Sequence, residues 1–342
     1  EWRANPSSTV AFVADPRRTD LALFDPHARR LIKQFTWGFT EPPFVGGARP
    51  GDSDLYAMSP PGWMLDRGWA LTAEVAGITA RDGLGPQRQP SVAWVRTRGT
   101  DATLLLGGRN LGQPSDPEVR IRVSVNGRAL ETFDVKPGFF LRVVTLPAGA
   151  LAAGGVTSAV PVASGTSVAS GFSRTITTEQ AESYIPLEVK SEAADGSGRE
   201  IAVALEQFDL QSPGTPMAAL DTGWQEPEYS PLTARSWHWM AERATMWVRP
   251  LGRDVILTLS GESPLRYFDE PPTVTITVAG RQVARFVPAD DFTQDIILPG
   301  EALAAAGGRV LVESDKWFVP GKQDAAADRR HLALRVYSYS VQ

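Results

Sequence analysis

The stretch WVRPLGRDVILTLSGES, Trp247–Ser263, repeats an earlier stretch of the same chain, WVRTRGTDATLLLGGRN, Trp94–Asn110. Aligned without gaps, they keep Trp, Val, Arg, Gly, Asp, two Leu and a Gly in register, 153 positions apart. Self-similarity at a fixed offset is the sequence signature of a duplicated structural unit. The pair therefore predicts that this 342-residue chain holds two copies of one domain.

Further matched segments occur in the same order on both sides of this pair. They are LDRGW (65–69) with LDTGW (220–224), VSVNGR (123–128) with ITVAGR (276–281), LPAGALAAGG (146–155) with LPGEALAAAGG (298–308), YIP (184–186) with FVP (318–320), and REIAVALEQFDLQ (199–211) with RHLALRVYSYSVQ (330–342). A shared order is hard to obtain by chance. We therefore expect one copy at 65–211, a linker at 212–219 and a second copy at 220–342.

The content of each copy predicts an all-β fold. Segments such as DVILTLSG, TVTITVAG and LALRVYSYSV alternate polar with β-branched or aromatic residues, and each ends at Gly, Pro or Asp. VNGR and VAGR, each between apolar runs, are hairpin signals. Strands at a spacing of roughly 8–12 residues predict two tandem β-sandwiches of jelly-roll type. The only helix-like pieces are GALAAGG and EALAAAGG, which end at a Gly pair.

Two segments fall outside the repeat. Residues 1–64 contain two or three candidate strands separated by Asp-Pro turns, and two placements stay open for them: docking on the first copy, or a small separate cap. Residues 156–180, rich in Ser, Thr, Ala and Gly, have no counterpart in the second copy and are expected to be a surface loop.

Composition restricts the function classes. The formal charge of −5 and the lack of a basic cluster argue against nucleic-acid binding. The chain has no Cys, which excludes disulfides, thiol catalysis and thiolate metal sites. No apolar run of about 18 residues is present. The chain begins with Glu1-Trp2 and no signal-peptide pattern, so we expect a processed protein or part of a longer one, with any membrane anchor outside this sequence.

No catalytic, metal or cofactor motif stands out. The three His (His27, His238 and His331) lack metal-ligand spacing, and neither Gly-x-Ser-x-Gly nor a phosphate-binding glycine loop occurs. Glu226 with Glu228, or Asp290 with Asp291, offer carboxylate pairs for acid–base work. Carboxylates so close in sequence are more often solvated turn residues. We therefore predict no catalytic, metal-binding or cofactor-binding residues.

Aromatic residues carry the stronger signal. Trp237 and Trp239 are two apart and share a face if they lie on a strand, and Trp224 and Tyr229 precede them closely. Flat aromatic rings bind the C–H faces of sugars, and flanking Glu, Asp and Arg bind the hydroxyls. The alternative is that these Trp residues fill the space between the sheets.

The two explanations do not apply equally to all the Trp residues. Trp239, Trp94 and Trp247 are expected to be core residues, the last two because they recur in the repeated phrase. Trp224 and Trp69 also recur, and for them both explanations stay open.

The sequence Asp328-Arg329-Arg330 has three possible roles. It is a solvated turn, or a bidentate Arg–Asp pair that locks the closing loop, or a site for an anion such as a lipid-linked phosphate.

At this point the second copy resembles a known type of domain. It opens with Gly223-Trp224 and Glu228, continues through Trp237–Trp239, and closes with Phe318-Val319-Pro320 and Asp328-Arg329-Arg330-His331-Leu332. This pattern is similar to the carbohydrate-binding-module-like β-sandwiches attached to bacterial polytopic membrane glycosyltransferases, including protein-mannosyltransferase-like enzymes. The first copy follows the pattern only in part, with Ser197-Gly198-Arg199 in place of Asp-Arg-Arg.

The resemblance implies a non-catalytic, extracytoplasmic, membrane-associated module that binds a glycan or lipid-linked sugar, or acts as a scaffold. The candidate glycan-binding residues are Trp224, Glu226, Glu228, Tyr229, Trp237, Arg329 and Arg330. Two alternatives stay open. One is a free-standing carbohydrate-active enzyme, which requires convergent carboxylates with a raised pKa in a cleft between the copies. The other is a structural spacer or protein-interaction domain, which requires a large apolar patch.

Overall fold

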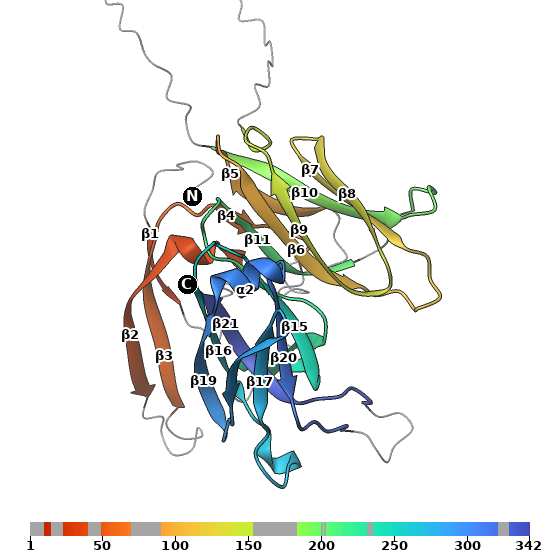
Figure 1. Cartoon of the computed structure of the whole chain (residues 1–342). Coiled ribbons are helices and arrows are strands. Elements are labelled where there is room, and N and C mark those ends of the chain that lie inside the picture. Colours follow the sequence, from red (N-terminus) through yellow and green to blue (C-terminus); the bar gives the residue numbers. More distant parts are fainter. Residues whose placement is uncertain are drawn as a thin grey trace, which may run out of the picture.

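The structure is a computed structural model that describes residues 10–14, 23–39, 49–69, 90–152, 183–199, 201, 203–230, 235–320 and 328–342. Within these residues the chain is almost entirely β, in five sheets. The predicted fold class, two tandem β-sandwiches with an N-terminal β segment, is confirmed, and Figure 1 shows the two sandwiches as separate bodies. The predicted loop at 156–180 lies outside the described residues.

The N-terminal segment forms a small sheet of its own. Its strands are β1 (Val10–Ala14), β2 (Arg29–Phe39) and β3 (Arg49–Met58), in the order β1-β3-β2. Asp25 ties the segment to the first sandwich, because this buried carboxylate accepts hydrogen bonds from Gln211 Nε2 and from the Gly62 amide, each at 2.9 Å. Of the two placements left open by the sequence, the structure thus combines a separate sheet with an anchor on the first copy.

The first sandwich contains strands β4 to β11. Their bounds are β4 (Trp63–Leu65), β5 (Ser91–Arg96), β6 (Ala102–Asn110), β7 (Val119–Val125), β8 (Arg128–Val135), β9 (Gly138–Leu146), β10 (Tyr184–Ala193) and β11 (Val203–Gln211). One sheet has the order β4-β5-β10-β7-β8 and the other has the order β11-β6-β9.

The second sandwich contains strands β12 to β21. Their bounds are β12 (Ala218–Leu220), β13 (Trp224–Ser230), β14 (Arg235–Met240), β15 (Arg243–Val248), β16 (Val255–Glu262), β17 (Val274–Val278), β18 (Arg281–Phe286), β19 (Asp291–Leu298), β20 (Arg309–Ser314) and β21 (Leu334–Val341). Its sheets have the orders β12-β15-β20-β17-β18 and β13-β14-β21-β16-β19. The short helix α2 (Gly300–Ala305) lies at the predicted EALAAAGG, and no described helix is long and apolar enough to cross a membrane.

The two sandwiches share their strand order. The order β12-β15-β20-β17-β18 repeats β4-β5-β10-β7-β8, and β21-β16-β19 repeats β11-β6-β9. Both copies of the repeated phrase keep a Gly, Gly108 and Gly261, at a point where two backbones approach closely. A Cβ at Gly108 would lie 2.1 Å from the Ala204 carbonyl oxygen, and a Cβ at Gly261 would lie 2.2 Å from that of Arg335.

One of the sequence matches is wrong. Leu187 of β10 pairs with Val125, and Val310 of β20 pairs with Val278, the position 153 residues after Val125. Strand β10 therefore corresponds to β20, so the YIP that opens β10 does not correspond to the FVP at 318–320.

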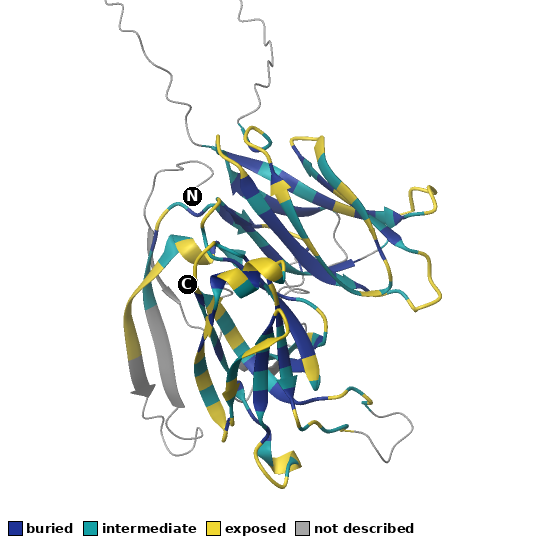
Figure 2. Cartoon of the chain, viewed as in Figure 1, coloured by how far each residue is buried: buried dark blue, intermediate teal, exposed yellow. Residues whose placement is uncertain are grey.

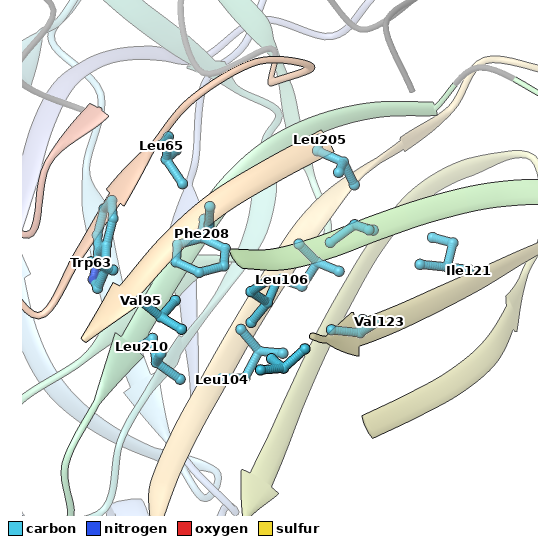
Figure 3. Packing of buried hydrophobic residues seen from close by; sticks show 14 of the residues in the cluster. Trp63, Leu65, Val95, Leu104, Leu106, Ile121, Val123, Leu205, Phe208 and Leu210 are labelled. Atoms are coloured by element: carbon cyan, nitrogen blue, oxygen red, sulfur yellow. The ribbon is translucent and has the colours of Figure 1, made fainter. Parts of the chain in front are cut away.

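Each sandwich encloses its own core. Buried residues of the first form one apolar cluster and those of the second form another, and Figure 3 shows Phe208 packed among core residues of the first. Figure 2 shows the expected alternation of buried and exposed residues along the strands. A smaller apolar cluster around Leu105, Met217 and Ala219 lies where the linker meets the first sandwich, with Trp247 packed against it.

The two predicted hairpin turns offer a test of the duplication. Asn126-Gly127 has φ values of 48° and 75°, and Ala279-Gly280 has 50° and 77°. Asn tolerates this left-handed region better than Ala, in which the Cβ crowds the backbone. We expect Ala279→Asn to raise the free energy of unfolding of the second sandwich by about 0.5–1 kcal/mol, and Asn126→Ala to lower that of the first by a similar amount. Urea denaturation measures both changes, and equal stabilities for parent and variants would contradict the assigned turn geometry.

Candidate glycan-binding face

The solvent side of the sheet β13-β14-β21-β16-β19 gathers most of the polar and aromatic candidates. Across this sheet Trp239 is opposite Arg335, and Arg335 is opposite Glu262. Residues directly opposite in neighbouring strands lie on the same face, and so does Trp237, two positions from Trp239. The neighbouring Met240 and Leu334, one position along each strand, belong to the core instead.

Arg335 is the centre of this face. Its guanidinium carbon lies 4.8 Å from the ring centroid of Trp237 and 4.6 Å from that of Trp239. Its Nη1 is 3.2 Å from Glu262 Oε2. Such cation–π contacts and the ion pair hold the two indoles and the carboxylate in one fixed arrangement.

Glu262 extends the face to a groove. The Tyr337 hydroxyl donates to Glu262 Oε2 at 2.5 Å and lies 3.4 Å from Asp291 Oδ1. The groove has a volume of about 490 Å³, within the range of ordinary ligand sites. It is lined by Ser236, Ser260, Gly261, Asp291, Phe292, Thr293 and Tyr337. We call Trp237, Trp239, Arg335 and Glu262, together with this groove, the polar–aromatic face.

Two donors of this face are not satisfied. Within the described residues, the buried Trp237 Nε1 and Arg335 Nε have no hydrogen-bond partner. An unpaired buried donor costs roughly 1–3 kcal/mol. Both atoms are buried, so they lower the stability of the free chain and are not presented to a ligand at its surface.

Arg330 organises the edge of the face. Its Nη2 lies 2.6 Å from Asp328 Oδ2 and 2.9 Å from Glu228 Oε1, and its Nε also contacts Asp328. The hydrogen bonds that Arg330 donates to Asp328 and Glu228 raise the pKa of Arg330, and the bond to Asp328 lowers the pKa of that carboxyl. Of the three roles open for this turn, the geometry matches the bidentate pair that locks the closing loop.

A second arginine connects the two sandwiches. Arg109 of β6 donates from Nη2 to the Trp224 carbonyl oxygen at 2.9 Å, and its Nη1 is 3.5 Å from Glu226. Its Nε is 3.0 Å from Glu206 of β11, whose side chain is only 6% exposed. Burial raises the pKa of Glu206 to about 7, and the attraction of Arg109 offsets only part of that effect. Beside it, Gln207 bonds both the amide and the carbonyl of Leu220 at 2.8 Å.

The predicted site residues occupy different places in the structure. Glu226, Glu228 and Arg330 lie together at the edge of the face, and the half-buried Trp237 lies on the face itself. Arg329 is exposed. Tyr229 of β13 is opposite Ser236 of β14, but the side chain of Tyr229 is not among those that the structure describes.

Trp224 is placed differently from its prediction as a sugar ligand. It is 3% exposed, belongs to the core of the second sandwich and donates from Nε1 to the Thr245 carbonyl oxygen at 2.8 Å. A ring enclosed on all sides offers no face to a sugar, so we remove Trp224 from the site. Trp239 is 4% exposed, as expected of a core residue, so it positions Arg335 but presents no ring to a ligand.

Sequence reasoning missed Arg335, Tyr337, Glu262 and Asp291. The alternation in LRVYSYSV predicts only that Arg335 and Tyr337 share a face of the sheet. It does not predict that Glu262 is the neighbour of Arg335 on the adjacent strand. No group of three or more His, Asp or Glu among the described residues is placed to hold a metal ion.

Comparisons with known proteins add little to this geometry. No protein-family model matches the sequence, and no curated protein matches it. Among solved structures, the chain is similar to the N-terminal CBM22-1–CBM22-2 tandem domain of Xyn10C from Paenibacillus barcinonensis, at 8% identity and a TM-score of 0.23, over 98% of this chain and 97% of that one.

Another similar structure is the M60 catalytic domain with CBM51-1 and CBM51-2 of ZmpB from Clostridium perfringens. It has 8% identity and a TM-score of 0.21, over 92% of this chain and 43% of that one. Likenesses this low carry no argument about the site.

Proposed function

We propose that this chain is a non-catalytic glycan-binding module and that the polar–aromatic face is its sugar-binding surface. One observation carries the proposal: a groove of about 490 Å³ lined by Tyr337, Asp291 and hydroxyl side chains lies beside a guanidinium that contacts the half-buried Trp237 and the buried Trp239.

The chemistry of the face fits neutral sugars. The Tyr337 ring in the groove would pack against the C–H face of a pyranose, whereas Phe292 is packed against the core. Asp291 accepts hydrogen bonds from sugar hydroxyls, and the Ser236 and Ser260 hydroxyls donate or accept. Arg335 is already paired with Glu262, which leaves no excess positive charge for an acidic sugar.

The proposal extends to a cellular setting. Because the second copy resembles such domains, we propose that the module lies outside the cytoplasm, in or near the membrane, as part of a glycosyltransferase-like envelope protein that handles a glycan or lipid-linked sugar. Fractionation of cells that make the full protein, with protease added to intact cells or spheroplasts, tests this setting. A cytoplasmic, protease-protected location would overturn it.

The binding proposal predicts a specific loss. We expect Trp237→Ala to weaken binding of a glycan selected from a bacterial glycan panel by tenfold or more, which corresponds to about 1.4 kcal/mol. The change removes one ring of the stack and frees Arg335 to move. Isothermal titration calorimetry measures the affinity, and circular dichroism verifies that the variant is folded.

A conservative variant and a null outcome complete this test. Trp237→Phe keeps an aromatic face and should retain part of the affinity. If the parent chain binds no glycan of the panel, the module proposal fails and the spacer alternative gains. If Trp237→Ala binds as tightly as the parent, the sugar site lies elsewhere.

One observation favours the enzyme alternative. A cavity of about 380 Å³ between the sandwiches is lined by Glu206, Asp209, His238 and Tyr339, and burial raises the pKa of both carboxyls. However, Asp209 already accepts from Trp63 Nε1 and Gln211 Nε2, and Glu206 is paired with Arg109. Both groups therefore have structural partners, and an assay for released reducing sugar in the same titration samples decides the matter. Release that Glu206→Gln abolishes would establish the enzyme.

A further inference from the structure

A second set of aromatic residues lies at the end of the second sandwich that carries the 265–273 and 314–320 loops. Trp317 is 42% exposed and Tyr267 is 46% exposed. We call these two residues, with the half-buried Phe318 and the exposed His331, the end-loop aromatic cluster. Two exposed aromatic rings at one site are unusual enough in a soluble sandwich to require an explanation.

Both exposed rings are backed by a second ring. Trp317 stacks on the His331 imidazole with centroids 4.0 Å apart and an interplanar angle of 10°. His331 is itself held by Glu242, with Nδ1 3.0 Å from Oε1. Tyr267 stacks on Phe318 at 3.9 Å and 16°. Each ring is thus fixed in orientation before any ligand arrives, which lowers the entropy cost of binding.

The cluster is continuous with the polar–aromatic face. Phe318 meets Trp239 edge-on with centroids 5.7 Å apart, and Trp239 carries Arg335 on its ring. The contacts run in order from Trp237 through Arg335, Trp239 and Phe318 to Tyr267. Ring contacts therefore connect the sheet face with the end loops through Trp239, which is itself only 4% exposed.

The rim of the cluster is charged. Lys316 Nζ is 3.4 Å from Glu270 Oε2, the Arg266 guanidinium lies 4.8 Å from the Tyr267 centroid, and Glu242 flanks His331. The centres of protein–protein interfaces are depleted of Lys and Glu and form contiguous apolar patches. Separate flat rings among charged hydrogen-bonding groups fit a sugar better than an apolar protein surface.

We propose that the end-loop aromatic cluster is a second sugar-binding surface, and that one linear glycan chain occupies it together with the polar–aromatic face. The inference rests on the proposed function and deepens it, because it defines the ligand as an oligosaccharide or polysaccharide rather than a single sugar. Two linked contacts on one chain raise the overall affinity through effective concentration, without any new contact.

The test is a chain-length series of the glycan that binds the parent. We expect affinity to rise steeply between oligosaccharides that cover one surface and those that reach both. Trp317→Ala should abolish that rise, about tenfold in the dissociation constant or more, and leave the affinity for the shortest binding oligosaccharide unchanged. Trp237→Ala should weaken binding at every length.

A direct signal separates this inference from the proposed function. In Trp237→Ala protein, we expect the longest oligosaccharide at millimolar concentration to shift the indole N–H resonance of Trp317 in a nitrogen–proton correlation spectrum. A parent-like length dependence in Trp317→Ala would overturn the second surface and leave the first intact. Dimerisation of the parent that Trp317→Ala abolishes would also overturn it, because the cluster would then bind a second copy of the chain.

Discussion

Trp224→Ala is expected to lower the free energy of unfolding of the second sandwich by about 3–5 kcal/mol, and Trp69→Ala to lower that of the first by a similar amount. Both rings are almost completely buried, at 3% and 1% exposed. Removal of either leaves a cavity in a closely packed core and deprives a buried carbonyl of its donor.

The two residues are structural counterparts. Trp69 Nε1 donates to the Val92 carbonyl oxygen at 2.8 Å, and Trp224 Nε1 donates to that of Thr245 at 2.8 Å. Thr245 is 153 positions after Val92, the same offset as in the repeated phrase. The neighbouring backbone bonds match as well, because the amides of Asp66 and Asp221 donate to the same two oxygens.

Differential scanning calorimetry of the parent and both variants measures the loss for each sandwich. The Trp224→Phe variant, which keeps part of the packing but lacks the N–H, should lose less stability than Trp224→Ala. A Trp224→Ala protein of parental stability that no longer binds glycan would contradict the core assignment and return Trp224 to the ligand site.

The duplication accounts for how much of the fold the sequence predicts. A gapless offset between two segments transfers strand register, turn position and the close approach at Gly108 and Gly261 together, because these all depend on spacing along one strand pair. The match of YIP to FVP failed since three residues of similar type carry no register. The copies differ in length between β9 and β10, so the offset cannot be carried across that gap.

The candidate site was less predictable for a related reason. Trp237 lies on the face and Trp224 in the core although both are Trp near a strand end, and their hydropathy is the same. Burial there depends on which side of the sheet each residue occupies. The bulge between Trp224 and Pro227 changes that side, and single-sequence periodicity does not reveal a bulge.

Contacts between the two sandwiches were outside the reach of sequence reasoning. Arg109 is part of the repeated phrase, where the second copy has Glu262, and its reach to Trp224 and Glu226 depends on the mutual placement of two separate cores. Such a contact joins residues that are 115 positions apart. No local pattern marks a residue for a role of that kind.

The contact between Glu206 and Arg109, where the two sandwiches meet, predicts that the free energy of unfolding depends strongly on pH. The pKa of Glu206 rises from 4.5 to about 7 in the folded chain, mainly through burial. Between these values the folded state holds a proton that the unfolded state has lost, so the stabilisation is full below about pH 4.5 and disappears as pH rises through 7. At 1.36 kcal/mol for each pKa unit, this amounts to about 3 kcal/mol.

Glu206→Gln should remove that dependence. The amide keeps the shape of the protonated acid and carries no charge at any pH, so the variant is expected to gain about 3 kcal/mol relative to the parent between pH 5 and pH 8. Urea denaturation at a series of pH values measures the difference. Glu131→Gln, which removes a carboxylate paired with Arg142 on the surface of the first sandwich, is the control and should change stability little at either pH.

The difference between variant and parent isolates Glu206 from the other buried groups at the contact. Burial also raises the pKa of Asp209 and lowers that of His238, and these two shifts act on stability in opposite directions as pH rises. Both are present in parent and variant and cancel in the comparison. An unchanged pH profile in Glu206→Gln would mean that Arg109 keeps Glu206 ionised at neutral pH. The bridge from Glu206 through Arg109 to Glu226 would then be a permanent ion pair rather than one that weakens as the carboxyl takes up a proton.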